Sequence, residues 1–395
     1  MDDSDSSRRR FLAVCGTALS AGVAGCSGSI FGGETEDTTP VDPQPSTPVP
    51  DAEGDGGPGG SDGAAGDFEQ FDQSDQSDQS DAATYTDVYR STAPSVAQIQ
   101  VYTGAPGPSQ GTGFVYSDGH VVTNQHVVEG AETIFLRFSE GGWLGAAVEG
   151  TDVYSDLAVL SVEGLPESAE PLALRESDPD VGTEVIAIGN PFGFSGSVSS
   201  GIVSGLNRTL PAPNDFSIPD AIQTDAPVNP GNSGGPLVTL DGSVAGVINS
   251  GGGNDIGFGI SAPLTRRVIP ALLEDGEFEH AYMGVRLQTV GPLHAEANDV
   301  DERVGVYIAV VRDGGPSEGV LQGSTGETTV AGQSGVETGG DIVVSMGGTP
   351  VPTREALASY LALETSPGDT IDVTVLRDGE ERTVELTLGS RPDPV

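Results

Sequence analysis

Short runs of β-branched residues, separated by Gly, Pro, Asp and Asn, make up most of the sequence from Thr86 onward. Typical runs are residues 95–101, 113–116 and 184–188. Strand-forming runs of this length and spacing are typical of a β-barrel or sandwich, and few stretches keep the period of a helix. The sequence therefore predicts a mostly β fold.

The acidic charge of the chain is not confined to one segment. The sequence holds 59 acidic residues against 16 basic ones, all of them arginine, for a net charge of −43. Residues 85–395 alone carry 42 acids and 13 arginines. Like charge at this density weakens a compact state at ordinary ionic strength, whereas molar salt screens it within about 3 Å. The composition predicts a halophilic, haloarchaeal source, with an unusually acidic mesophile as the alternative. It excludes nucleic acid as a partner, because nothing could neutralise a row of phosphates.

The first 26 residues have the features of an export signal. Residues 7–12 resemble a twin-arginine signal, a short apolar stretch follows, and residues 23–26 resemble a lipobox that ends in Cys26. We expect export by the twin-arginine pathway and a lipid anchor on Cys26 at the outer face of the cytoplasmic membrane. The alternative is a short anchor helix with an incidental cysteine. Because Cys15 leaves with the signal, the mature domains would have no disulfide.

Composition divides the chain into four parts. After the signal at 1–26, residues 27–84 hold 14 acids and no base and are too poor in apolar residues to form a core. We expect this stretch to be a disordered acidic linker that acts as a tether. We expect one folded domain over 85–275 and a second over 280–391.

Three motifs carry side chains suited to nucleophilic catalysis. In the first motif, a strand runs into a turn that carries His126. In the second, Asp156 precedes an apolar strand, and in the third, Ser233 lies in a glycine-rich loop. The motifs are residues 121–128, 155–160 and 223–237. His120 is the rival to His126, but it lies in a turn before the strand.

A serine hydroxyl becomes a nucleophile when a base removes its proton and a carboxylate orients that base. Ser233, His126 and Asp156 supply these three parts. Gly231 lets the backbone turn so that its own N–H and that of Ser233 form an oxyanion hole, with Asn232 shaping the turn. Each such donor is worth about 3 kcal/mol in the transition state. Each motif alone could be structural, but together and in this order they predict a serine hydrolase.

The same motifs resemble those of the HtrA/Deg family of serine proteases. The resemblance is carried by residues 123–128, 155–159, 189–193, 198–203 and 231–237, and it extends over about 85–392. It implies a double β-barrel, trypsin-like (chymotrypsin-fold) protease domain with the active site between the barrels. It also implies a homotrimer and active-site loops that respond to peptide binding.

The resemblance bears on substrate preference as well. It places Ile248, Asn249 and Ser250 in the wall of the specificity pocket. No acid lies between Ala226 and Leu237 to receive a basic side chain. We expect cleavage of unfolded protein after small or medium aliphatic residues.

The C-terminal region resembles a PDZ domain of the HtrA type. A helix at 264–273 and an acidic linker lead into its strands, and a second helix is expected at 353–363. The loop formed by Tyr282, Met283, Gly284 and Val285 would receive the carboxylate of a peptide C-terminus, and the peptide would add as a strand. Residues 316–340 form an insertion, either a surface hairpin or a change in access to the groove.

Two functions of different classes follow from these features. The first is an endopeptidase that degrades misfolded proteins outside the cytoplasm, and the second is a peptide-binding chaperone or sensor with a dormant protease. The four histidines are scattered and no pair has ligand spacing, so no metal site is expected. The glycines lie in turns and loops rather than between a strand and a helix, so no nucleotide or flavin cofactor is expected.

Overall fold

The computed structural model describes residues 83–190, 196–211, 217–253, 256–300 and 305–392, with side chains for all of these but 250–253. The expected signal and nearly all of the expected linker lie outside the described residues. Within the described part, no helix has the length and apolar character needed to cross a membrane.

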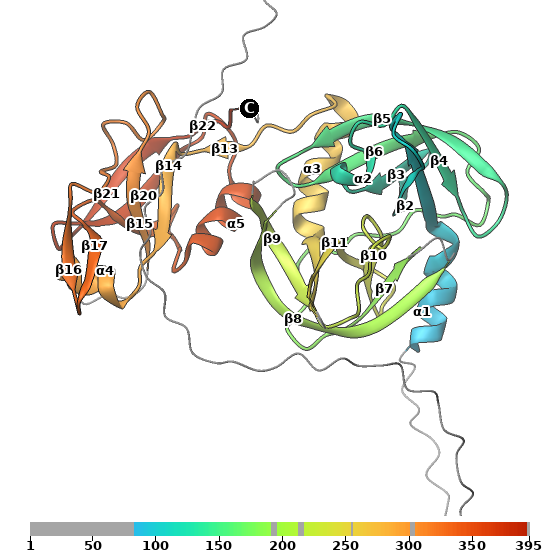
Figure 1. Cartoon of the computed structure of the whole chain (residues 1–395), viewed down its shortest axis with the longest axis horizontal. Helices are drawn as coiled ribbons and strands as arrows, with labels where there is room; N and C mark the ends of the chain where they lie inside the picture. The colour runs from blue at the N-terminus through green and yellow to red at the C-terminus, as the bar shows by residue number, and fades with distance from the viewer. Residues whose placement is uncertain (1–82, 191–195, 212–216, 254–255, 301–304, 393–395) are drawn as a thin grey trace, which may run out of the picture. The chain divides into compact units, whose positions relative to one another are not determined.

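Six antiparallel strands close the first barrel in the order β1-β2-β3-β6-β5-β4 (Figure 1). They are β1 (Val96–Tyr102), β2 (Ser109–Ser117), β3 (His120–Thr123), β4 (Thr133–Arg137), β5 (Trp143–Asp152) and β6 (Leu157–Val162). Side chains such as Ile99, Leu136 and Leu160 point inward and are fully buried. Gly119 makes the tight turn between β2 and β3 at a φ of +80°, a conformation that favours glycine.

A second barrel has the order β10-β11-β12-β9-β8-β7 (Figure 1). Its strands are β7 (Glu184–Gly189), β8 (Ser197–Pro211), β9 (Ser217–Thr224), β10 (Pro236–Thr239), β11 (Val244–Gly253) and β12 (Ile256–Ser261). Helix α3 (Ala262–Glu274) follows, and the Ser261 hydroxyl caps it by accepting from the Leu264 N–H. One buried cluster joins Phe114 of the first barrel, Ile186 of the second and Val268 of α3. The two barrels therefore share a core, which fixes the loops that meet between them.

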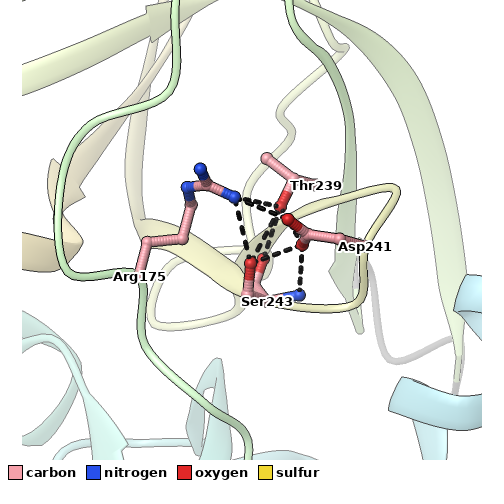
Figure 2. A network of polar contacts seen from close by, with 4 residues as sticks. All are labelled: Arg175, Thr239, Asp241 and Ser243. Carbon is pink, nitrogen blue, oxygen red and sulfur yellow. Dashed lines mark hydrogen bonds and ion pairs between the residues drawn. The ribbon is translucent and has the colours of Figure 1, made fainter.

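The hairpin between β10 and β11 is closed by a polar network (Figure 2). Oδ1 of Asp241 accepts from the Thr239 hydroxyl at 2.6 Å and from the Ser243 N–H at 2.9 Å. Its other oxygen accepts from Arg175 Nη1 at 2.7 Å. Burial alone would raise the pKa of Asp241, but these hydrogen bonds and the Arg175 charge outweigh it and hold the pKa below its usual range. The network closes the turn of this hairpin, whose first strand, β10, begins directly after the loop that carries Ser233.

A second, smaller domain has a main sheet in the order β14-β15-β18-β20-β21, with β19 paired to β18 (Figure 1). The main strands are β14 (Val285–Thr289), β15 (Val306–Val311), β18 (Ile342–Met346), β19 (Thr349–Pro350), β20 (Thr370–Arg377) and β21 (Glu380–Thr387). Two further strands, β13 (Ala281–Tyr282) and β22 (Gly389–Ser390), pair near the ends of the domain. Its helices are α4 (Pro292–Ala297) and α5 (Arg354–Glu364).

The mostly β prediction is confirmed by the two barrels and this sheet. The expected helices at 264–273 and 353–363 lie within or close to α3 and α5. The 316–340 insertion contains a hairpin of β16 (Gly326–Val330) and β17 (Gln333–Thr338), as the first of its two interpretations expected.

Helix α1 (Tyr85–Thr92) and the 3₁₀ turn after it (Ala93–Ser95) were not expected from the sequence. A capping box begins α1, since Thr84 and Asp87 bond each other's backbone N–H groups. This Thr-x-x-Asp pattern was the signal that could have predicted the helix.

Candidate active site

His126 lies in α2 (Gln125–Val128), a single helical turn directly after β3. Its Nδ1 is 2.6 Å from Oδ2 of Asp156, and its backbone N–H donates to the other carboxylate oxygen at 2.9 Å. The side chain is 27% exposed, whereas that of Asp156 is 2% exposed. One edge of the imidazole is therefore oriented by a buried carboxylate while the ring remains accessible.

Asp156 ends the turn between β5 and β6 in the left-handed conformation, at a φ of +54°. Aspartate is one of the few non-glycine residues that adopt this conformation singly, because its short polar side chain can form local hydrogen bonds. The Asp156 carbonyl oxygen accepts from Asn124 Nδ2 at 3.0 Å and from the Gln125 N–H at 3.1 Å. These bonds tie the aspartate turn to the segment that carries His126.

Ser233 lies in the loop between β9 and β10 and is half-buried. Its hydroxyl donates to the carbonyl oxygen of Asn249 at 2.8 Å. The amide Nδ2 of the same Asn249 donates to Oδ2 of Asp156 at 2.5 Å. The three predicted catalytic residues are thus brought together, with Asn249 as the link. Among the described residues, no hydrogen bond joins Ser233 to His126.

The loop before Ser233 depends on glycine. Gly231 has a φ of +100°, and its carbonyl oxygen accepts from the Thr112 hydroxyl at 2.6 Å. A Cβ at Gly234 would lie 2.1 Å from the Thr112 carbonyl oxygen, so no other residue fits there. In the part of the chain that the structure describes, the N–H groups of Gly231 and Ser233 donate to no protein acceptor. Asn232 is buried, and its N–H donates to the Asn229 carbonyl oxygen at 3.0 Å.

The three residues expected in the pocket wall occupy different environments. Ile248 is 1% exposed and packs in the core of the second barrel, so its side chain does not line an open pocket. Its backbone instead fixes the serine loop, because its carbonyl oxygen accepts from the Gly234 N–H at 2.8 Å. Asn249 is also buried and contacts Asp156. Ser250 lies in β11 with its side chain outside the described residues.

The expected carboxylate loop leads into β14, the first strand of the main sheet of the smaller domain. Tyr282 ends β13, Gly284 has a φ of +73°, and Val285 begins β14. Met283 is 2% exposed and packs in the domain core. Since β14 is an edge strand, an added peptide strand could pair with it.

Several residues that support the site were not predicted from the sequence. The amide of Asn249 holds Asp156, Asn124 ties the aspartate turn, and the Thr112 hydroxyl bridges Gly231 and the Asn190 N–H. Asn124 had a usable signal, because it stands two residues before His126 in the motif. Thr112 had none. No group of three or more His, Cys, Asp or Glu side chains in the described part could hold a metal ion.

Comparison with known proteins identifies both domains. The family model for the trypsin-like peptidase domain matches residues 111–247, and the family model for the PDZ domain matches residues 281–388. A solved structure described as an HtrA-type protease, AlgW with tripeptide, is 30% identical with a TM-score of 0.64, and the match covers 79% of this chain and 98% of that one. The serine endoprotease from Yersinia pestis is 27% identical with a TM-score of 0.55, over 78% and 98% of the two chains.

Curated relatives share the same description, probable periplasmic serine endoprotease DegP-like. The protein of Halomonas elongata is 38% identical over 75% of this chain, and that of Pseudomonas putida strain W619 is 37% identical over 72%. This chain spans 60% and 57% of their lengths. These relatives are bacterial and do not support the expected haloarchaeal source. The fold and the matches define a trypsin-like domain followed by a PDZ domain, and the chain belongs to the HtrA/DegP-like family of serine proteases.

Proposed function

We propose that this chain is a serine endopeptidase that degrades unfolded or misfolded proteins outside the cytoplasm. Ser233 is the nucleophile, His126 the general base and Asp156 the carboxylate that orients the base. The observation that carries the proposal is the continuous set of contacts from His126 through Asp156 and Asn249 to Ser233. The family's trypsin-like domain supports the reaction class.

The reaction begins with a rotation of the Ser233 hydroxyl. It leaves the Asn249 carbonyl oxygen, its acceptor at 2.8 Å, and turns to Nε2 of His126. His126 then takes the hydroxyl proton while Ser233 Oγ attacks the substrate carbonyl carbon. Asp156 stabilises the resulting imidazolium through the 2.6 Å contact at Nδ1.

The oxyanion that forms at the substrate carbonyl needs hydrogen-bond donors that are not already bonded to another acceptor. The N–H groups of Gly231 and Ser233 meet this condition within the described residues, with Asn232 setting the turn between them. His126 next donates its proton to the leaving amine, and water hydrolyses the acyl-enzyme by the same path. We propose small or medium aliphatic residues at the cleaved bond, with residues 248–250 near the substrate.

The smaller domain binds the C-terminus of a peptide in this proposal. The loop of Tyr282, Met283, Gly284 and Val285 receives the carboxylate, and the edge strand β14 pairs with the peptide. Because the Ser233 hydroxyl is engaged by Asn249, the resting protease would have low activity until a ligand acts. The same observation favours a second candidate function, a peptide-binding chaperone or sensor with a dormant protease.

Cleavage of unfolded β-casein in multimolar salt tests the proposal. The wild type is expected to cleave and Ser233→Ala to lose at least about 1,000-fold in kcat, because the nucleophile is removed. The cut sites then report the residue preference, and predominant cleavage after Arg would contradict it. If neither protein cleaves although both are folded, even with a C-terminal peptide added, the endopeptidase proposal fails and the chaperone is favoured.

We also propose how the chain is exported and anchored. The twin-arginine signal exports it, Cys26 carries the lipid anchor, and residues 27–84 tether a trimeric protease to the outer face of the membrane. The word periplasmic in the relatives' descriptions supports export. Mass spectrometry of the mature N-terminus tests the anchor, and an unmodified Cys26 within an intact signal would contradict it.

A further inference from the structure

The turn that carries Asp156 is held by a residue from outside the two barrels. This turn, residues 152–156, joins β5 to β6. His280 lies between α3 and β13, on the segment that leads into the PDZ domain. Its Nε2 is 2.8 Å from Oδ2 of Asp152, at the start of the turn. Both residues are buried, at 8% and 5% exposure.

Asp152 determines the shape of the turn. Its Oδ1 accepts from the Tyr154 N–H at 3.2 Å. Oδ2 accepts from the Ser155 N–H at 3.0 Å and from the Ser155 hydroxyl. The next residue is Asp156 in its left-handed conformation. A buried carboxylate must be matched by donors, and His280 supplies one from outside the turn, where the charge of Arg391 also acts on Asp152.

His280 is itself held in place by neighbouring residues. Its ring makes edge-on contacts with Phe278 and Tyr154, with centroids 4.8 and 5.4 Å away. Its carbonyl oxygen accepts from the Arg391 N–H at 2.9 Å. The Arg391 guanidinium lies 3.8 Å from the centre of the Tyr154 ring, and the Tyr154 hydroxyl donates to the Pro392 carbonyl oxygen.

We propose that His280 is a positioning residue for the catalytic aspartate. Its Nε2–H fixes Asp152, Asp152 fixes the turn, and the turn presents Asp156 to His126. The entry and exit segments of the PDZ domain, which pair as β13 and β22, thereby contribute to the geometry of the catalytic base. This inference rests on the proposed peptidase function for its kinetic consequence, but the contacts are independent of it.

Kinetics of the full chain in multimolar salt test the proposal. His280→Phe keeps a ring between Phe278 and Tyr154 but removes the donor to Asp152. A small displacement of the base can cost up to about 100-fold, so we expect kcat to fall at least about fivefold with KM within about twofold of wild type. His280→Gln is expected to recover most of kcat, because its amide can still donate.

Arg267→Gln is the matched control for a general loosening between α3 and the PDZ domain. Arg267 donates to the Leu363 carbonyl oxygen at 2.5 Å and to that of Thr365, and its guanidinium lies 5.9 Å from the centre of the Phe278 ring. Arg267→Gln therefore loosens the packing beside His280 but leaves the donor to Asp152 in place. It is expected to leave kcat within about twofold of wild type. An equal loss of kcat in Arg267→Gln and His280→Phe, or wild-type kcat in His280→Phe, would overturn the proposal.

A proton NMR measurement separates this proposal from the proposed activity. The Nδ1–H proton of His126 in its short bond to Asp156 should resonate far downfield, and its absence in His126→Ala assigns it. We expect His280→Phe to shift or broaden this signal and Arg267→Gln to leave it unchanged. If His280→Phe does not fold, Asp152→Asn is measured in its place, with the same expectation. An unchanged signal overturns the positioning role even if the wild type proves inactive on casein.

Discussion

Two carboxyl groups outside the active site influence each other, that of Asp178 between β6 and β7 and that of Asp220 in β9. Burial and the nearby charge of Asp220 raise the pKa of Asp178 to about 7, and burial raises the pKa of Asp220 as well. Asp220 is 1% exposed, and its Oδ2 accepts from the Ser261 hydroxyl that caps α3. One oxygen of each carboxyl group lacks a protein partner. As the pH rises through about 7, Asp178 therefore ionises in the folded state with one carboxyl oxygen unpartnered and beside the Asp220 carboxyl group.

Asp178→Asn is expected to stabilise the protein at high pH. Because the pKa of Asp178 is raised by folding, the folded state binds more protons between about pH 4 and 7, and stability falls as pH rises through this range. Removing the charge should raise the free energy of unfolding by roughly 1–2 kcal/mol at pH 8, after allowance for solvent screening, and by almost nothing at pH 4. Denaturant unfolding at both pH values measures the difference. Asp180→Asn, an exposed aspartate in the same loop, should show no gain, and equal gains at both pH values would contradict the explanation.

At the scale of single elements, the β10–β11 hairpin connects the polar network around Asp241 to the candidate active site. The network of Arg175 and Asp241 closes the hairpin (Figure 2). Strand β10 follows Gly235, and β11 contains Asn249. The pKa of Asp241 is held low in the folded state, so the ionised form stabilises the hairpin above the usual aspartate range. That contribution is lost as the pH falls toward the folded pKa.

Asp241→Asn should destabilise the hairpin modestly. Loss of the charge weakens several hydrogen bonds at a largely exposed position, so we expect about 1 kcal/mol at neutral pH and a smaller difference below about pH 4. Thermal unfolding in constant salt measures the change. Asp313→Asn, an exposed aspartate for which the structure has no such network, is the control. A loss that does not shrink on acidification would show that the charge of Asp241 is not its cause.

At the scale of the whole molecule, repulsion between acidic groups acts on every element at once. Residues 85–395 carry 42 acids against 13 arginines. Salt bridges such as Arg377 with Asp341 pair only some of these acids. Screening by salt is therefore expected to govern stability more than any single contact does.

We predict that the melting temperature rises by at least about 10 °C between 0.1 and 3 M NaCl, because the Debye length shrinks from about 10 Å to a few ångströms. Thermal melts monitored by circular dichroism measure this. A neutral osmolyte at equal osmolality is the control, since it stabilises without screening charge. A melting temperature that is independent of salt, or that responds equally to the osmolyte, would contradict the halophilic interpretation.

Much of the fold and of the candidate site was predictable because its information is local. The strand runs predicted a barrel or sandwich, and the resemblance to the HtrA/Deg family implied two barrels. The motifs around His126, Asp156 and Ser233 each occupy a contiguous stretch with a characteristic residue order. Gly234 is required by a backbone approach that the Gly-rich pattern already indicated. Helix α1 was missed although its capping pattern was present, because its apolar residues are too few to make a clear helical period.

The sequence by itself determined the class of fold, the reaction chemistry and the chain order of the residues that would carry it. Only the tertiary structure decided how those residues are held. The Ser233 hydroxyl bonds a carbonyl 16 residues away, His280 contacts Asp152 across 128 residues, and Ile248 turns into the core rather than toward a pocket. Such contacts depend on how strands from distant parts of the chain pack against one another, so no pattern of neighbouring residues encodes them.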